Sequence, residues 1–488
     1  MSVYDRIRQA LHERGRLIEA SEKQPPDILG VTEDSRRVRP GWLFCAIDGT
    51  TEDGHAYVSH AASRGAAAAI VTHRQDVALP QLVVDDSRAA TSIAAAEWFG
   101  WPADKLAVIG VTGTNGKSTT VALIRHLLNR DADVACVGTL GAFDGQGAPL
   151  YEEGLTTPGS VQLQETLAEL CDRGATRVVM EVSSHALSQS RVDGVVFAAS
   201  VYTNLTHDHL DYHSSFDDYL RAKSQLAEKI RPDGALVVNA DEAHWASLPH
   251  RDGVRRVSFG TGPDAMVRAT DLRMGSEGSS FQLHIGDRAV GARTPLLGEF
   301  NVSNALAAAA LAWSLDEPFE EIVSRLASAP QVPGRMEPLD SKGCLILRDY
   351  AHTPDALDRA VNAARQLTSG KLVVLFGCGG DRDREKRPVM GRIAARGADL
   401  VVVTSDNPRT EDPDRIIDDI EQGIDGHEHL RITDRREAIE RAMGLLREDD
   451  CLLLAGKGHE TYQVVGTERR PFDERQIVSA VLRGQATS

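Results

Sequence analysis

The sequence GVTGTNGKST, residues 110–119, joins an apolar strand candidate to a helical pattern and contains the residue types that bind phosphate. Glycines let backbone N–H groups approach phosphate oxygens, and the N-terminus of the following helix adds a positive dipole. The spacing of the two glycines is shorter than in a full Walker A motif, and an ordinary glycine-rich turn is the alternative. Because Gly-Lys-Ser-Thr opens a helix here, we rank nucleotide binding above that alternative. The predicted phosphate loop comprises Gly113, Thr114, Asn115, Gly116, Lys117, Ser118 and Thr119.

A second polar stretch, TNLTHDHLDYH at residues 203–213, brings three histidines and two aspartates into seven positions. One interpretation is a zinc hydrolase site built on His207, His209 and His213, but the last histidine comes one position late for an HxHxDH motif. Another is a solvated polar loop with one or two packed histidines. A third uses Glu181, in MEVSSH, and a group near His209 to hold magnesium on ATP phosphates. The phosphate loop favours the third interpretation.

Lysine is rare in this chain: nine of the 54 basic residues are lysines, and four of them lie in motif-like stretches. Arginine cannot replace lysine where a compact charge or a neutral amine is needed. Lys223 lies on a predicted amphipathic helix, residues 216–230, where a solvated lysine is the ordinary interpretation. The four motif-like lysines are Lys117, Lys223, Lys386 and Lys457.

The 488 residues exceed the size of one ordinary core and predict three domains, residues 1–103, 104–336 and 337–488. These boundaries fall within the segments GWPADK and APQVPGRMEPLDSKG. In the second and third domains, strand candidates alternate with helical stretches, which predicts mostly parallel, doubly wound sheets. Ligands gather at the carboxyl ends of such strands, where several polar motifs lie, including DNPR after ADLVVVTS.

Composition excludes several classes of protein. A formal charge of −17 argues against a nucleic-acid-binding surface and against attraction to an anionic membrane. The N-terminus lacks the apolar core of a signal peptide, and no apolar run is long enough to cross a bilayer. The six scattered cysteines contain no CxxC pair and predict buried free thiols in a reducing cytoplasm. We expect a cytoplasmic monomer without membrane insertion.

The motifs, taken in order, resemble the Mur ligase family, MurE type. They are GVTGTNGKST, MEVSSHAL, TNLTHDHLDYH, FDDYLRAK, GEFNVSNALAA, VPGRME, RDYAHTPDAL, FGCGGDRDREKRP, DNPRTEDP and AGKGHE, and the resemblance covers residues 34–460. The resemblance implies a smaller α/β N-terminal domain for the UDP-sugar, a central P-loop-type ATPase domain and a C-terminal Rossmann-like domain for the amino acid. It also implies ATP, two Mg²⁺ ions, UDP-N-acetylmuramoyl-L-alanyl-D-glutamate and meso-2,6-diaminopimelate.

The same resemblance assigns roles around the nucleotide. Lys223 matches a carbamylated lysine (N6-carboxylysine) that would bind the second magnesium, which reverses the surface interpretation of this side chain. Lys117, Glu181, His209 and Lys223 would be catalytic, and Ser118, Glu181, His209 and the Lys223 carbamate would hold metal. Besides the loop, the ATP contacts would come from Asn301, Asn304, Arg335 and Asp349.

For the other substrates the resemblance implies two further sets of residues. The UDP-dipeptide would contact Ser35, Thr50, Thr51, Thr156, Thr157, Ser183, Gln189 and Arg191, although Thr50 and Thr51 replace a more usual His-Gln-like pair. Diaminopimelate would contact Arg382, Asp406, Asn407, Arg409, Gly456 and Glu460. Arg409 could also be a solvated charge beside a turn, but a planar guanidinium suits the second carboxylate that distinguishes diaminopimelate from lysine.

The implied reaction is ATP-driven amide formation through an acyl phosphate. Positioning and charge neutralisation would do most of the work, and closure of the domains is expected because the phosphate loop and DNPR lie on different ones. The alternatives are an L-lysine-adding ligase, a folylpolyglutamate synthetase-like ligase, the zinc hydrolase and an ATP-binding module without catalysis.

Overall fold

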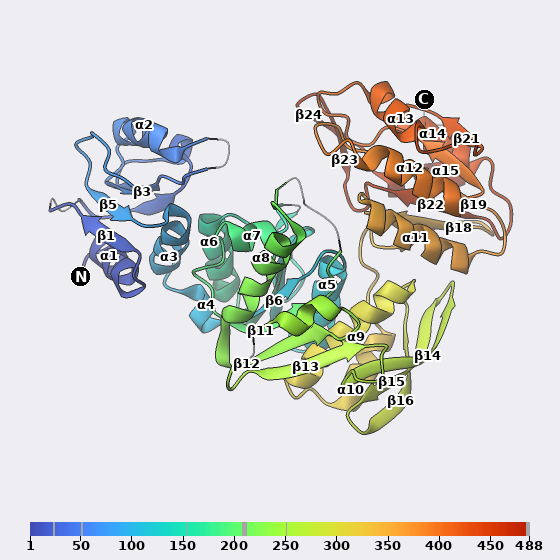
Figure 1. Cartoon of the computed structure of the whole chain (residues 1–488), viewed down its shortest axis with the longest axis horizontal. Coiled ribbons are helices and arrows are strands. Elements are labelled where there is room, and N and C mark those ends of the chain that lie inside the picture. The colour runs from blue at the N-terminus through green and yellow to red at the C-terminus, as the bar shows by residue number, and fades with distance from the viewer. Residues whose placement is uncertain (23–24, 50–51, 153, 207–211, 250, 485–488) are drawn as a thin grey trace.

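The computed structural model describes the chain except residues 23–24, 50–51, 153, 207–211, 250 and 485–488. Three α/β units follow one another along the chain (Figure 1). The N-terminal unit lies at one side of the central unit, and the C-terminal unit lies above the other side. The predicted α/β class with three successive units is therefore confirmed.

The N-terminal unit is a five-stranded sheet in the order β1-β5-β4-β3-β2. Strands β2 to β5 pair in parallel, and β1 adds an antiparallel edge. Its elements are α1 (Val3–Glu13), β1 (Leu17–Ala20), β2 (Gly30–Thr32), η1 (Ser35–Arg37), β3 (Trp42–Cys45), η2 (Gly54–Tyr57), α2 (Val58–Ser63), β4 (Ala68–Val71), β5 (Gln81–Val84), α3 (Ser87–Trp98) and α4 (Pro102–Lys105).

The central unit is an eleven-stranded sheet, in the order β16-β15-β14-β13-β12-β11-β6-β10-β7-β8-β9. Its middle strands pair in parallel, and β6 and β10, which precede the phosphate loop and Glu181, are neighbours. The strands are β6 (Ala107–Thr112), β7 (Val134–Gly138), β8 (Gly141–Phe143), β9 (Pro149–Glu152), β10 (Arg177–Glu181), β11 (Phe197–Tyr202), β12 (Ile230–Asn239), β13 (Arg255–Gly260), β14 (Val267–Gly275), β15 (Gly278–Ile285) and β16 (Arg288–Thr294).

Helices cover this sheet and place the catalytic motifs. The alanine-rich α9 is buried along most of its length, because small side chains let it pack closely against its neighbours. The helical elements are α5 (Lys117–Leu128), α6 (Ser160–Asp172), α7 (Ser184–Ser188), α8 (Phe216–Glu228), η3 (Ala243–Ser247), α9 (Glu299–Ser314) and α10 (Phe319–Ala327).

The antiparallel strands at both edges of the central sheet were not predicted. Strands β14, β15 and β16 form a meander in which buried and more exposed positions alternate along much of β14 and β15 and at the end of β16. That alternation is the ordinary signal of a half-buried antiparallel strand and was present in the sequence.

The C-terminal unit is a six-stranded sheet in the order β17-β18-β22-β19-β20-β21, parallel except for β17. A separate hairpin, β23-β24, lies beside it. The elements are β17 (Glu337–Leu339), β18 (Leu345–Asp349), α11 (Pro354–Leu367), β19 (Leu372–Phe376), α12 (Lys386–Gly397), β20 (Leu400–Val403), α13 (Pro413–Glu421), β21 (His429–Arg431), α14 (Arg435–Met443), β22 (Cys451–Ala455), β23 (Tyr462–Val465), β24 (Glu468–Pro471) and α15 (Glu474–Leu482).

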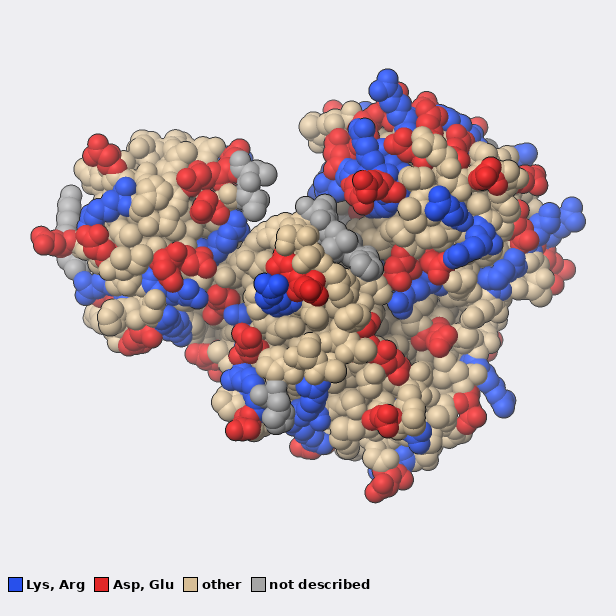
Figure 2. Space-filling model, viewed as in Figure 1, with Lys and Arg blue, Asp and Glu red and all other residues tan. Residues whose placement is uncertain are grey.

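The domain boundaries stay predictions. The one after residue 103 falls inside α4, and the one after residue 336 falls directly before β17. Within the described ranges no helix is both long and apolar enough to cross a membrane. The six cysteines are free, and burial raises the pKa of the Cys45, Cys378 and Cys451 thiols to about 12. On the face shown in Figure 2, acidic and basic side chains are interspersed.

Candidate active site

The phosphate loop connects β6 to α5 and depends on two glycines in the left-handed region. Gly113 has φ 143° and Gly116 has φ 84°. A Cβ on Gly113 would lie 1.9 Å from Thr203 Oγ1, and one on Gly116 would lie 2.4 Å from Asn304 Oδ1. Only glycine satisfies both the backbone conformation and these approaches, so the loop is pressed between neighbouring polar groups.

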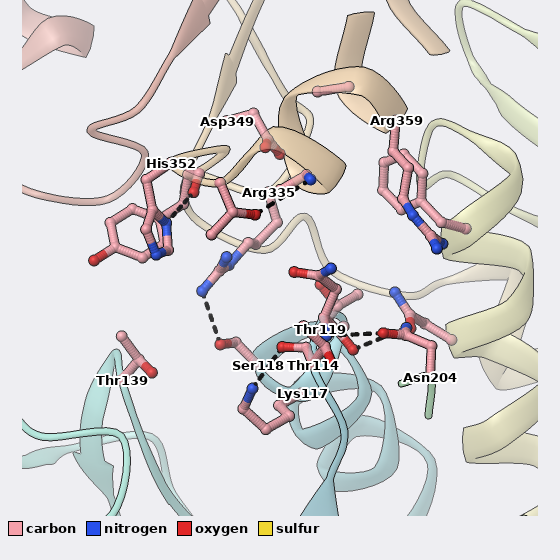
Figure 3. A pocket seen from close by; sticks show the side chains of 18 of the residues that line it. Thr114, Lys117, Ser118, Thr119, Thr139, Asn204, Arg335, Asp349, His352 and Arg359 are labelled. Atoms are coloured by element: carbon pink, nitrogen blue, oxygen red, sulfur yellow. Dashed lines mark hydrogen bonds between the residues drawn. The ribbon is translucent and has the colours of Figure 1, made fainter. Parts of the chain in front are cut away.

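Two cationic side chains lie at this loop. Lys117 donates from Nζ to the carbonyl oxygens of Gly113, at 3.1 Å, and Thr114, at 2.8 Å. Arg335, in the segment before β17, donates to Ser118 Oγ at 3.0 Å. Figure 3 shows Arg335 extending towards Ser118 across the pocket. A point charge and a guanidinium from two parts of the chain thus meet at the start of α5, where the helix dipole is also positive.

The loop lines a cavity of about 1100 Å³, including its open mouth, between the central and C-terminal units. Polar groups with known phosphate and metal affinity line one side, and residues of α11 line the other. The predicted residues that line it are Thr114, Asn115, Gly116, Lys117, Ser118, Thr119, Thr156, Glu181, Asn304, Arg335 and Asp349.

Asn301 and Asn304 have different places in this arrangement. Asn304 lines the cavity, whereas Asn301 is buried and donates to the Leu297 carbonyl at 2.8 Å. Asn304 in turn donates to Asn301 Oδ1 at 2.9 Å. Asn301 therefore orients Asn304, and the structure does not place it on the cavity wall.

Asp349, at the end of β18, also positions a neighbouring residue. Its carboxylate accepts from the Met336 backbone N–H at 2.7 Å, and Met336 has a left-handed φ of 45°. Burial raises the pKa of this carboxyl to about 6, and the Arg335 guanidinium opposes the rise. The Arg335 guanidinium also lies 4.9 Å from the centre of the Tyr350 ring. Asp349 thereby shapes the turn that carries Arg335.

Glu181, at the end of β10, offers a carboxylate to the same cavity. Only 2% of it is exposed, and Thr139 holds it by a backbone donor at 2.9 Å and a hydroxyl donor at 3.3 Å. A fixed carboxylate beside a phosphate loop is a hard oxygen donor of the kind that Mg²⁺ prefers. Ser118, in the first turn of α5, also lines the cavity and carries a hydroxyl group.

Lys223 lies on α8 and is only 1% exposed, so the interpretation as a solvated lysine is wrong. Its Nζ donates to the Gly113 carbonyl at 2.8 Å and lies 4.5 Å from the centre of the Tyr219 ring. A buried lysine amine loses its proton more easily than an exposed one, and a neutral amine is the form that reacts with carbon dioxide. Its position directly behind the phosphate loop suits the predicted carbamate.

The histidine cluster is described only in part, since His207 and His209 lie outside the described residues. His213 is buried, with Nε2 3.0 Å from Ser184 Oγ and Nδ1 3.6 Å from an oxygen of Asp218. Its ring packs near Tyr219 and Tyr212. In the part of the chain that the structure describes, no group of three or more His, Cys, Asp or Glu residues could hold a metal ion.

The residues predicted for the dipeptide end form one connected network. Thr157 donates to the Glu181 carbonyl at 2.9 Å and accepts from the Ser183 N–H at 3.0 Å. Arg191 donates to the Thr157 carbonyl at 2.9 Å and to Gln189 Oε1 at 2.6 Å. Thr156 extends the network, because it accepts from Thr139 at 3.2 Å.

The uridine side is less complete. Ser35 is 9% exposed and lines a second cavity, in the N-terminal unit, together with Glu33, Phe44 and Tyr57. Thr50 and Thr51 lie outside the described residues. Burial raises the pKa of the Glu33 carboxyl, and the Arg191 guanidinium of the central unit opposes the rise.

In the C-terminal unit, Arg409 is half-buried and has a left-handed φ of 52°. Strand β23 holds this strained backbone: Arg409 donates to the Val464 carbonyl at 3.1 Å and accepts from Gly466 at 2.7 Å. Its guanidinium donates to the Gly380 carbonyl at 2.7 Å. A Cβ on Gly379 would lie 2.9 Å from Arg409 Nη1 and 3.8 Å from Arg382 Cγ, so the two arginines flank this glycine.

The remaining residues predicted for the amino acid lie in the segments that follow β20 and β22. Asn407 donates to Glu460 Oε2 at 2.9 Å, and a Cβ on Gly456 would lie 2.7 Å from Asp406 Oδ2. Lys457, absent from the predicted site residues, is fully buried among them. Its place in the AGKGHE motif and the rarity of lysine were the available signals.

Sequence reasoning also missed three residues around the phosphate loop and Glu181, of which Asp355 joins the central and C-terminal units. Asp355, on α11, accepts from Asn115 at 2.8 Å and from Thr206 at 3.2 Å. Asn204 accepts from the Asn115 N–H at 2.9 Å, and Thr139 anchors Glu181. Both Asn204 and Asp355 lie within motifs, but nothing in the order of residues says that the two motifs meet.

A phosphate loop at the carboxyl end of a parallel sheet, facing a second α/β unit across a polar cavity, defines a nucleotide-dependent enzyme. Three family models match in succession: "Mur ligase family, catalytic domain" at residues 27–107, "Mur ligase middle domain" at 111–312 and "Mur ligase, glutamate ligase domain" at 334–458. The chain belongs to the Mur ligase family.

Individual relatives extend this result over nearly the whole chain. A UDP-N-acetylmuramoyl-L-alanyl-D-glutamate--2,6-diaminopimelate ligase of Geobacillus kaustophilus is 41% identical over 94% of this chain and 95% of its own. The ligase of the same name from Synechococcus elongatus is 44% identical over 93% and 94%. A solved structure of a ligase with this name is 34% identical, with a TM-score of 0.68 over 95% and 96% of the chains.

We predict that Gly116→Ala weakens ATP use because the new Cβ would meet Asn304 and the residue would keep a left-handed φ. The KM for ATP should rise about tenfold or more, since about 1.4 kcal/mol of strain or displacement corresponds to that factor. The KM for ATP is measured from the steady-state rate of ADP release. Gly275→Ala is the matched control, because a Cβ there meets nothing within 4 Å. Equal ATP kinetics in the two variants would contradict the proposed contact.

Proposed function

We propose that this protein is an ATP-dependent, ADP-forming ligase. It adds meso-2,6-diaminopimelate to the D-glutamyl γ-carboxylate of UDP-N-acetylmuramoyl-L-alanyl-D-glutamate in peptidoglycan synthesis. The observation that carries the proposal is the polar cavity in which the phosphate loop, Glu181 and Arg335 face one another. The names of relatives that match almost end to end support the choice of substrates.

Neither sister ligases nor a hydrolase fit as well. The relatives named above carry the diaminopimelate name, not that of a lysine-adding enzyme. A folylpolyglutamate synthase of Mycobacterium tuberculosis shares the fold but is 17% identical. A phosphate loop is unnecessary for a zinc hydrolase, and His213 is occupied by packing and by Ser184.

In the first step, an oxygen of the D-glutamyl γ-carboxylate attacks the γ-phosphorus of ATP, and the bond from that phosphorus to the bridging oxygen breaks. The products are an acyl phosphate and ADP. The loop N–H groups and the α5 dipole would hold the phosphates, and Lys117 and Arg335 would neutralise charge that develops on the transferred group. Lys117 lies at the phosphate loop itself, where its Nζ bonds to the loop carbonyls.

Ser118 and Glu181 line the cavity and offer oxygen donors of the kind that Mg²⁺ prefers, which supports the proposal of magnesium. Ser118, Glu181, His209 and a Lys223 carbamate would hold two Mg²⁺ ions, which when bound supply neutralisation of the phosphate charge. The carbamate forms when the neutral Lys223 amine adds to carbon dioxide and loses a proton, so that a buried cation becomes an anionic oxygen ligand.

In the second step, the neutral amine of diaminopimelate attacks the acyl carbon. The tetrahedral intermediate then expels phosphate, and the nitrogen loses its proton to give the amide. Arg409, with Arg382, would bind the carboxylate at the far carbon, whereas Asp406, Asn407 and Glu460 would bind the ammonium group beside it. Closure of the C-terminal unit on the central unit would bring this amine to the acyl phosphate.

We further propose that the protein acts in the cytoplasm as a monomer. All three substrates are soluble anions or zwitterions of that compartment. Arg335, Asn115 and Asp355 join the two catalytic units within one chain.

The direct test is ADP release with UDP-N-acetylmuramoyl-L-alanyl-D-glutamate and each amino acid in turn. We expect turnover with meso-diaminopimelate and about ten- to a hundredfold lower kcat/KM with L-lysine, since a lost bidentate carboxylate pair is worth roughly 1.5–3 kcal/mol. Turnover with L-lysine alone would reject the proposed amino acid, and silence with both would reject the ligase.

The Lys223→Ala variant should lose most activity because the carbamate oxygens disappear. Added short carboxylates should restore part of it by occupying the emptied space. Arg221→Ala is the control, since Arg221 is an exposed cation two residues earlier on the same helix. A fully active Lys223→Ala variant would disprove a role for the carbamate.

The Arg409→Ala variant should raise the KM for diaminopimelate about ten- to a hundredfold, because one charge-assisted contact worth roughly 1.5–3 kcal/mol is lost. The KM for ATP should stay within about twofold, because the phosphate loop is unchanged. Arg396→Ala provides the comparison, since that side chain is 72% exposed and pairs with Asp358. An unchanged KM for diaminopimelate would show that Arg409 is a solvated charge beside a turn and does not bind the amino acid.

A further inference from the structure

Lys457 is a fully buried cation in the C-terminal unit. It follows β22 and Gly456, and none of its surface is exposed. Burying an ammonium group costs several kcal/mol unless charged and polar partners compensate it. The partners here are Glu460 Oε2, at 3.0 Å, and Asn407 Oδ1, at 3.0 Å. Both belong to the residues proposed to bind the amino acid, so the lysine connects two parts of that pocket.

The contacts of Lys457 fix how Asn407 presents its amide. An ammonium group only donates, and the Val464 backbone N–H also donates to Asn407 Oδ1, at 2.8 Å. Oδ1 therefore faces these two donors, and Nδ2 faces Glu460 Oε2 at 2.9 Å. The bonds from Asn407 and Lys457 both reach Oε2 of Glu460, and Oε1 is the oxygen that we expect to accept from a substrate amine.

Lys457 also sets the charge of the pocket. Asp406 and Glu460 contribute two carboxylates, and the ammonium group of Lys457 offsets one of them. Among these three groups one negative charge remains, which suits the ammonium group of an amino acid, whereas Arg409 and Arg382 are proposed to bind a carboxylate.

Two titratable neighbours of the lysine keep one charge state near neutral pH. Burial lowers the pKa of His459 to about 3, with Arg335 next in effect, and burial raises the pKa of Tyr350. Neither group changes charge between roughly pH 5 and 8. The other groups that face the site are Asp406, Glu460 and Tyr462, whose ring lies 5.9 Å from Lys457 Nζ and under Arg469.

We propose that Lys457 is a positioning residue for the incoming amino acid: it orients Asn407 and Glu460 and balances the charge of Glu460 and Asp406. This inference rests on the proposed ligase function. Lys457 touches no reacting atom, and its effect is on amino-acid binding, not on phosphoryl transfer.

The test compares Lys457→Met, which keeps the length but loses charge and donors, with Lys457→Gln, which keeps an N–H donor. Lys371→Met is the control, since Lys371 is exposed and precedes β19 in the same unit. In Lys457→Met we expect the KM for diaminopimelate to rise about thirtyfold, as for loss of a hydrogen bond to a charged group, and the KM for ATP to change less than about twofold.

The conservative variant separates positioning from a structural role. The rise in KM should be smaller in Lys457→Gln, which can still donate to Asn407 or Glu460. A thermal melt and direct ATP binding identify any variant that fails to fold.

The outcomes are distinguishable. An unchanged KM for diaminopimelate in folded Lys457→Met would overturn the proposal, as would an equal loss of ATP binding, which indicates structural damage. Should Lys457→Met not fold, the same readouts in Lys457→Gln decide. If the wild-type protein releases ADP with L-lysine alone, the proposed substrate fails. The same comparison with L-lysine then still decides the role of Lys457, since that substrate also carries an ammonium group.

Discussion

The approach of Thr203 and Asn304 to the phosphate loop is the constraint on which the active site depends. At Gly113 and Gly116 these polar side chains come so near the backbone that no Cβ fits. The loop N–H groups are thus fixed before any phosphate arrives, which lowers the ordering cost of binding. A chain of net charge −17 has no general attraction for a polyphosphate, so this local, rigid arrangement must supply it.

The loop also organises its surroundings through contacts that cross between units. Lys223 bonds to the Gly113 carbonyl from behind, Arg335 reaches Ser118, and Asp355 accepts from Asn115. Residues far apart in sequence are therefore held around one short segment (Figure 3). Movement of the C-terminal unit would change the nucleotide cavity and the position of the amino-acid pocket together.

The amino-acid pocket is also held in one geometry, but by other interactions than the phosphate loop. The left-handed backbone of Arg409 is strained, and strand β23 holds it by hydrogen bonds on both sides. Beside it, Lys457 is buried only because Asn407 and Glu460 compensate its charge. Backbone strain and a buried ion pair both restrict the pocket to one geometry, which suits discrimination between amino acids that differ by one carboxylate.

The sequence by itself determined the α/β class, the strands that precede each motif, and the phosphate loop, because these depend on neighbouring residues. Residue order also identified most of the cavity lining, from Thr114 to Asp349, through motifs. Only the tertiary structure decided that Lys223 is buried, that Asn301 lies behind Asn304, and that Lys457 pairs with Glu460 inside the pocket. The physical reason is that burial and pairing depend on strands and helices far apart in the chain, and the local pattern on α8 allowed either a solvated or a buried lysine.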